Sequence, residues 1–248
     1  GCSQTLLVRY RDGPAPVRTQ LSLAMAALAV HMKLHFWSIT DGERPNVLHW
    51  VYGKLSGDPA NVNVMLEFIT VLPQEATSYK LSILPARRRE FMKELSASSP
   101  DAFSLLGHYA QQGNVSEKTA EQILLAFGSW LRVSDDIDPK AIMESPLTLH
   151  TFNALEVSTD SIFEAAVDAI SELVIISSGG LITGMPEQKH LPLVQLIVER
   201  VLKLRPRLKA VVQSAQEGDG DEELAKPLAR LFSEVCLRCS INIVLSVR

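Results

Sequence analysis

Few residues of this 248-residue chain have the types and spacing that chemistry requires. Cys236 and Cys239 have the separation of half a zinc site or of a redox pair, yet no second pair of ligands lies near them. The six histidines are scattered, and no two share a helix face with a carboxylate as in a zinc hydrolase. They are His31, His35, His49, His108, His150 and His190. We therefore expect no metal centre, and we interpret the two thiols as a buried or incidental pair.

A second candidate for chemistry is the Gly/Ser-rich stretch from Ser177 to Gly184, whose composition is that of a phosphate loop. It lacks the Lys and Ser/Thr that follow such a loop, and it is predicted to connect two helices without a preceding strand. The chain also has no Gly-x-Ser-x-Gly motif, and spacing singles out no Ser, His and acid set. We predict that the chain is not an enzyme and needs no cofactor.

Arg87, Arg88 and Arg89 form the densest basic cluster. Guanidinium groups make forked contacts with carboxylates and phosphates, so this cluster predicts contact with an acidic face of a partner. The alternative is a solvated first turn of a helix, in which Glu90 and Glu94 screen the arginines at helical spacing.

Composition limits the classes of partner. Apolar residues make up 46% of the chain and charged residues 21%, which is typical of a folded protein and not of a disordered one. The net charge of -4 has the wrong sign for a protein that binds phosphate backbones, so we expect no direct nucleic-acid binding. No apolar run approaches the roughly 18 residues of a membrane span, so we expect no membrane insertion.

The apolar residues recur at three- and four-residue steps, which predicts helices and no sheet. One predicted stripe is Val17, Leu21, Met25, Leu28 and Met32; another is Val62, Leu66, Ile69 and Leu72. The predicted helices span about residues 3–11, 16–32, 46–56, 59–72, 86–112, 116–133, 139–156, 159–177, 187–216 and 221–246, with breaks near Ser98, Ser145 and Pro206.

Helix starts are marked by a capping side chain, followed in most cases by a proline whose missing N–H costs nothing there. The predicted caps are Asp58, Ser99, Ser116, Asp138 and Ser145. The second helices of successive predicted pairs are separated by about 41, 59, 43 and 66 residues, and two of these intervals match HEAT-type repeats. A helical bundle also produces amphipathic helices of this length, so spacing alone leaves both architectures open.

Five segments resemble the karyopherin-β family of nuclear transport receptors, in particular its plant-type transportin-SR branch. They are Val17–His31, Leu66–Glu75, Arg87–Phe91, Phe127–Arg132 and Ile170–Leu173, with Leu231–Phe232 further on. Their order and separations also agree with that family, and the resemblance covers most of residues 3–236. It is lost at residues 33–46, at residues 181–190 and after Cys236.

The resemblance implies a fold class, an all-α, right-handed α-solenoid of HEAT/ARM-like helical hairpins. We expect residues 1–248 to form a single segment of about five repeats, a fragment of the N-terminal half of a longer solenoid. Residues 177–190 and 217–221 are expected to be loops between helices. Each hairpin would bury its apolar stripe against its neighbours.

The same resemblance implies partners and location. A karyopherin carries protein cargo, here SR-type splicing factors, and also engages the Ran GTPase and nucleoporins while it shuttles between nucleus and cytoplasm. Glu67 and Glu75, on or just after a second helix, are expected to lie where a concave surface meets a partner. The alternative function is a helical-repeat scaffold or adaptor that does not depend on Ran.

Overall fold

The computed structural model describes residues 2–32, 46–113, 115–134, 137–157, 160–178, 188–216 and 222–246. Within these ranges every regular element is a helix, which confirms the all-α prediction. The chain divides into two compact units, Gly1–Asp136 and Ile137–Arg248. The prediction of one continuous segment across both units is not tested by this division. The predicted loop at residues 217–221 and most of the predicted loop at residues 177–190 lie outside the described residues.

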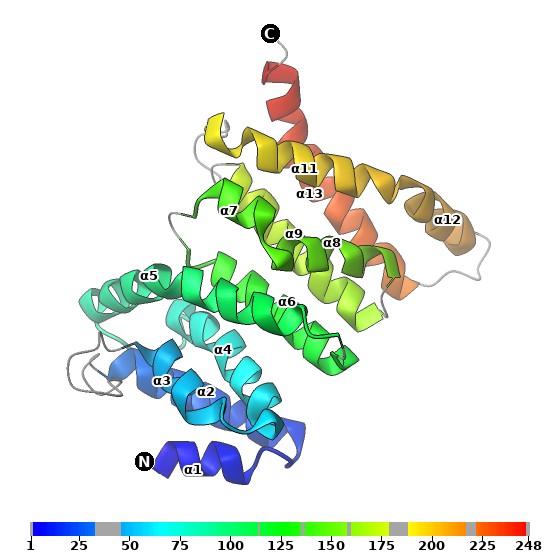
Figure 1. The fold of residues 1–248 in the computed structure, drawn as a ribbon. Coiled ribbons are helices and arrows are strands. Elements are labelled where there is room, and N and C mark those ends of the chain that lie inside the picture. Colours follow the sequence, from blue (N-terminus) through cyan, green and yellow to red (C-terminus); the bar gives the residue numbers. More distant parts are fainter. Residues whose placement is uncertain are drawn as a thin grey trace. The chain divides into compact units, whose positions relative to one another are not determined.

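The described residues of the first unit form three helical hairpins. They are α1 (Cys2–Arg9) with α2 (Ala15–His31), α3 (Val47–Leu55) with α4 (Val62–Thr77), and α5 (Pro85–Ala110) with α6 (Glu117–Leu131). A short 3-10 turn, η2 (Pro59–Asn61), leads into α4. The second helices form a row in which α4 packs between α2 and α6 (Figure 1). This sequential layering is the arrangement that HEAT-like hairpins require.

The second unit continues the pattern with interrupted first helices. The predicted helix around residues 139–156 is divided into α7 (Pro139–Glu144) and α8 (Pro146–Val157), which confirms the break at Ser145. Helix α8 pairs with α9 (Asp160–Ser177). A 3-10 turn, η3 (Gln188–His190), precedes α11 (Leu191–Lys203) and α12 (Arg205–Gln216), and α13 (Glu222–Ser246) then packs along α9 (Figure 1).

Four of the five predicted helix caps are confirmed. The side chains of Asp58, Ser116, Asp138 and Ser145 each accept a hydrogen bond from a backbone N–H two or three residues ahead, at 3.0–3.2 Å. These bonds satisfy donors that have no partner inside the first helical turn.

The predicted helix start at Ser99 is wrong. Helix α5 runs through Ser99 and Pro100 without the break expected near Ser98. The Ser99 hydroxyl is buried and donates to the Leu95 carbonyl at 3.2 Å, and it accepts a bond from the Ser134 hydroxyl. Packing inside the unit therefore overrides the local preference of the Ser-Pro pair.

The buried face of α2 also differs from the predicted stripe. Met25 is buried as expected, but Val17 and Leu28 are 40% and 42% exposed. The buried positions instead include Ala26 and Ala29, together with Ser22 and Val30. Small residues on this face allow the backbones of α2 and α4 to approach closely. A prediction based on large apolar residues overlooks such small positions.

Helix α4 continues past Pro73 to Thr77, although the sequence predicted an end at residue 72. Pro73 has no N–H, so the carbonyl of Ile69, four residues earlier, loses its normal helical donor. The fully buried indole of Trp130 on α6 supplies the replacement, because its Nε1–H donates to the Ile69 oxygen at 3.0 Å. A side chain from the next hairpin thus completes the helix.

We predict that Trp130→Phe lowers the free energy of unfolding by about 1–3 kcal/mol, because it leaves a buried carbonyl unpaired. Pro73→Ala restores a backbone donor for Ile69, so the same Trp130 substitution should cost less in that background. Urea unfolding of the four proteins of this double-mutant cycle separates the lost bond from the lost volume. Equal costs in both backgrounds would show that the indole N–H does not replace the missing donor.

Burial also lowers the pKa of His150 on α8, whose Nε2 atom is buried without a hydrogen-bond partner among the described residues. The unfolded chain therefore binds more protons than the folded chain between the lowered pKa and the ordinary value near 6.5. We predict that stability falls as the pH falls through this window and that His150→Gln reduces the fall. Urea midpoints of the unmodified chain and of His150→Gln, taken at pH 7.5 and at about pH 5, measure this loss of stability. An identical loss of stability in both proteins would contradict the prediction.

Candidate functional site

A row of polar side chains runs along α4 at three- and four-residue steps. Its members are Asn63, Glu67, Thr70 and Gln74. Three of them bond to α6: Thr119 Oγ1 donates to Asn63 Oδ1 at 2.9 Å, Gln122 Nε2 donates to Thr70 Oγ1 at 2.6 Å, and Gln74 Nε2 donates to Ser129 Oγ at 3.0 Å. This polar row fixes the position of α4 along α6, since each hydrogen bond forms only when its two residues lie side by side.

Glu67, a predicted partner-binding residue, is the member of the polar row that faces α2. The hydroxyl of Thr19 donates to Glu67 Oε1, and the Nε atom of Arg18 lies 3.5 Å from Oε2. The side chains of Arg18 and Glu67 are only 13% and 14% exposed, so their ion pair is screened less than a surface pair would be. The carboxylate joins two second helices, and its contact with a partner stays a prediction.

Glu75, the other predicted acidic residue, lies in the last turn of α4, because the helix extends beyond Pro73. Its side chain is half-buried, and we find no ion-pair partner for it among the described residues. Of the two predicted acidic residues, Glu75 is therefore the one without an ion pair among the described residues, and its contact with a partner stays a prediction.

Arg87, at the start of α5, caps the end of α2. Its Nε and Nη2 atoms donate to the carbonyls of Val30 and Met32 at 3.0 and 2.6 Å, and its guanidinium lies over the Phe91 ring. Burial acts to lower the pKa of Arg87, but hydrogen bonds to Glu94 and Glu90 outweigh it and hold that pKa above its ordinary value. A cation at the C-terminal end of a helix also complements the helix dipole.

Arg88 performs the same task for α4. Its Nη1 atom donates to the carbonyls of Ala76 and Ser78 at 2.7 and 2.8 Å, and its Nη2 atom donates to the Leu81 carbonyl at 2.9 Å. Arg89 is exposed. The structure thus divides the predicted cluster into two arginines that bind helix ends and one that faces outward, and partner contact at any of the three stays a prediction.

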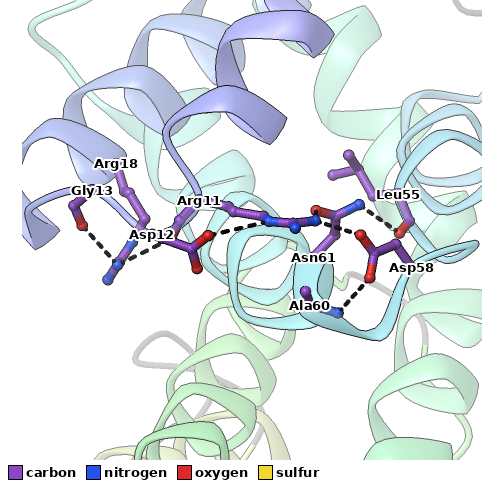
Figure 2. Close-up of polar contacts among 8 residues, drawn as sticks. All are labelled: Arg11, Asp12, Gly13, Arg18, Leu55, Asp58, Ala60 and Asn61. Atoms are coloured by element: carbon purple, nitrogen blue, oxygen red, sulfur yellow. Dashed lines mark hydrogen bonds and ion pairs between the residues drawn. The ribbon is translucent and has the colours of Figure 1, made fainter.

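A further polar cluster joins the α1–α2 turn to the α3–α4 turn (Figure 2). The guanidinium of Arg11 donates to the carboxylate of Asp58 and, at 3.2 Å, to Asn61 Oδ1. Two hydrogen bonds lower the pKa of Asp58: the one from the backbone N–H of Ala60 has the larger effect, and the one from the Arg11 side chain the smaller. Arg18 Nη1 donates to the Gly13 carbonyl at 3.1 Å, which connects this cluster to Glu67. Sequence reasoning identified Asp58 as a cap and missed its partner.

Two clefts among the described residues are further candidate surfaces. One, of about 380 Å³, lies between α3 and α5, where His49 Nε2 is 3.1 Å from Asp101 Oδ2 beside Tyr52. The other, of about 570 Å³, lies between α9 and α13. Its lining residues are Asp160, Ser161, Glu164, Lys226, Pro227 and Arg230. The four-residue spacing of the charges on each helix is readable from the sequence, but which two helices lie side by side is not.

The remaining candidates for chemistry stay separate. Cys236 is exposed on α13, and the side chain of Cys239 is not among those described. Ser177 and Ser178 end α9 with their hydroxyls bonded to helix carbonyls, and the rest of the Gly/Ser-rich stretch lies outside the described residues. In the part of the chain that the structure describes, no three His, Cys, Asp or Glu side chains form a group suited to a metal ion. Over the same residues, no helix combines the length and apolarity needed to cross a membrane.

We predict that Arg88→Ala lowers the free energy of unfolding by about 2–4 kcal/mol, because two carbonyls at the end of α4 and the Leu81 carbonyl beyond it lose a charged donor. Arg89→Ala is the matched control and should leave stability within about 0.5 kcal/mol of the unmodified chain. Urea unfolding measures both. If the two substitutions cost the same, Arg88 is a surface residue like its neighbour and does not bind the helix end.

Comparison with known proteins identifies the family. The model of the family described as "Exportin 1-like protein" matches residues 14–170. The chain is 36% identical over 231 residues, 93% of its length, to "Transportin MOS14" of Arabidopsis thaliana, and 27% identical over 238 residues to an uncharacterized protein of Schizosaccharomyces pombe. It spans 22% of the length of each relative. Because the family match covers more than half of the chain, the chain belongs to the exportin 1-like family of karyopherin proteins.

Proposed function

We propose that this chain is part of a nuclear transport receptor that carries protein cargo between cytoplasm and nucleus under the control of the Ran GTPase. The similarity to Transportin MOS14 along 93% of the chain is the observation that supports this proposal most strongly. The stacked hairpins support it as well, because a row of small interfaces can change curvature while each hairpin stays folded.

The finer parts of the proposal are the cargo and the other partners. SR-type splicing factors are the proposed cargo and nucleoporins the proposed contacts at the pore, on the basis of the sequence resemblance. Among the predicted binding residues, the exposed side chain of Arg89 and the half-buried side chain of Glu75 are the proposed contacts. Arg87, Arg88 and Glu67 would act indirectly, because their polar atoms already bind other helices.

The proposed receptor is not an enzyme and uses no cofactor of its own. A scaffold or adaptor of the same helical repeats remains the second candidate, since stacked hairpins serve many functions and the fold alone does not separate them. Dependence on Ran distinguishes the two, because a scaffold has no reason to release its partner when Ran carries GTP.

The test is a pull-down of the full-length protein with a cargo rich in Arg-Ser repeats, with and without GTP-loaded Ran. We predict that cargo binds alone and is released when GTP-loaded Ran is added, because the two compete. GDP-loaded Ran is the control and should leave the cargo bound. A protein that holds its partner equally in all three conditions is a scaffold.

A further inference from the structure

The loop between α4 and α5 carries an exposed serine. Residues 78–84 have no helical structure, and the side chains of Tyr79 and Leu84 are 90% and 77% exposed. Ser82 lies between them and is also exposed, and its hydroxyl has no hydrogen-bond partner among the described residues. Enzymes that modify serine act on accessible segments outside helices, so the Ser82 hydroxyl is open to such an enzyme.

Arg88 has N–H groups to spare beside this loop. A guanidinium has five N–H donors. Arg88 uses both donors of Nη1 for the carbonyls of Ala76 and Ser78, and one donor of Nη2 for the Leu81 carbonyl. Its Nε–H and the second N–H of Nη2 have no partner among the described residues. Arginine binds a phosphate group with just such a pair of donors.

These two donors lie within reach of a phosphate on Ser82. The Leu81 carbonyl belongs to the peptide bond that joins Leu81 to Ser82, and Arg88 Nη2 is 2.9 Å from its oxygen. Covalent geometry then places the Ser82 Cα atom no more than about 6 Å from Nη2, while the phosphate oxygens of a phosphoserine extend roughly 4–5 Å from Cα. A phosphate on Ser82 can therefore bind Arg88 while the loop keeps its path.

The charge of the segment also favours a phosphate. Residues 78–89 contain four basic residues, Lys80 and Arg87 to Arg89, and no acidic residue. The next acidic residue in the sequence, Glu90, is paired with Arg87 at 2.9 Å. A phosphoserine carries a charge of about -1.5 to -2 at pH 7, so this surplus of positive charge attracts it.

We propose that Ser82 is a phosphorylation site and that Arg88 receives the phosphate. The modification ties the loop more firmly to the end of α4, which Arg88 already binds. The proposal goes beyond the proposed function, because it applies equally to a transport receptor and to a scaffold. Neither outcome of the Ran experiment supports or contradicts it.

The enzyme is a basophilic serine kinase, and the phosphoryl donor is ATP. Lys80 lies two residues before Ser82 and the apolar Ile83 follows it, which is a pattern that kinases of the protein kinase C class accept. The Ser82 oxygen forms a bond to the γ-phosphorus of ATP as the bond from that phosphorus to the β–γ bridging oxygen breaks. ADP leaves, and the hydroxyl proton passes to the catalytic carboxylate of the kinase.

The first test incubates the whole folded chain with purified protein kinase C and Mg-ATP and maps the phosphate by mass spectrometry. We expect Ser82 to be the main site, so Ser82→Ala should lower total incorporation about fivefold or more. The control is Ser104→Ala, which removes an exposed serine inside α5 and should leave incorporation unchanged. Phosphate mainly at other residues, or none on Ser82, overturns the proposed site.

The second test examines the receiving group and does not depend on the kinase. Phosphoserine is placed at position 82 of the whole chain by an expanded genetic code, and ³¹P NMR follows its titration. The midpoint should lie about 0.5–1 pH unit below that of a phosphoserine peptide of residues 78–86, which lacks the arginines, because a nearby cation favours the dianion. A midpoint equal to that of the peptide overturns the proposal.

Variants identify the arginine that binds the phosphate. Arg88→Lys keeps the charge but removes the paired donors, so it should abolish at least about half of the titration shift. Arg89→Lys is the matched control on an exposed neighbour and should keep the shift. A shift that survives Arg88→Lys in a protein with unchanged circular dichroism assigns the phosphate to another group and contradicts the proposal.

Thermal unfolding supplies a separate readout. Phosphoserine at position 82 should raise the melting temperature by about 2–5 °C, because it adds charge-assisted bonds to the end of α4. Phosphoserine at position 104 is the control for added charge and should give no rise. An unchanged or lower melting temperature with phosphoserine at position 82 would show that the phosphate does not tie down the loop.

Discussion

Burial of α4 on nearly all sides is the constraint on which the first unit depends. Ten of its residues, from Val64 to Ala76, are buried, so its polar groups cannot rely on water. Among the described residues, neighbouring hairpins supply polar contacts along the helix: α2 at Glu67, α6 at Thr70 and the Ile69 carbonyl, and α5 at the end of the helix. The hairpins are therefore joined by specific bonds as well as by apolar contact.

This constraint explains why a basic cluster that resembles a binding patch is largely structural. The carbonyls that end a helix need donors, and in a stack of hairpins the start of the next first helix lies close to them. Arg87 and Arg88 occupy that position for α2 and α4. In the second unit, Arg207 of α12 donates in the same way to the Leu155 carbonyl of α8 and lies over the Phe163 ring at 4.6 Å. A guanidinium suits the task because it offers several donors in a fixed plane.

Much of the fold could be predicted from the sequence, because helical periodicity and capping are local signals. Asp58, Ser116, Asp138 and Ser145 cap helices where their neighbours in sequence indicated. The errors lie where tertiary contacts decide. Pro73 and the Ser99-Pro100 pair look like interruptions, yet both lie inside helices. The Trp130 indole from the next hairpin binds the Ile69 carbonyl that Pro73 leaves without a donor, and Ser99 is buried with its hydroxyl bonded to Leu95 and Ser134.

The candidate surfaces were predicted less well for the same reason. Nothing in residues 87–89 distinguishes the two arginines that bind carbonyls from the exposed one, since the carbonyls belong to distant segments. Likewise, the acidic row of α9 and the basic pair of α13 gain meaning only when the two helices are placed side by side. The spacing of the charges along α9 and along α13 can be read from the sequence, but the packing of these two helices against each other cannot.

Hydrogen exchange along α4 tests most directly the claim that neighbouring hairpins complete this buried helix. Amides of residues 74–77, beyond Pro73, should exchange as slowly as those of residues 66–72 and open only with the whole first unit. Trp130 replaces the donor that Pro73 lacks, and Arg88 binds the carbonyls at the end of α4. Rapid, loop-like exchange of residues 74–77 beside a protected first half would show that α4 ends at the proline, and would contradict the claim.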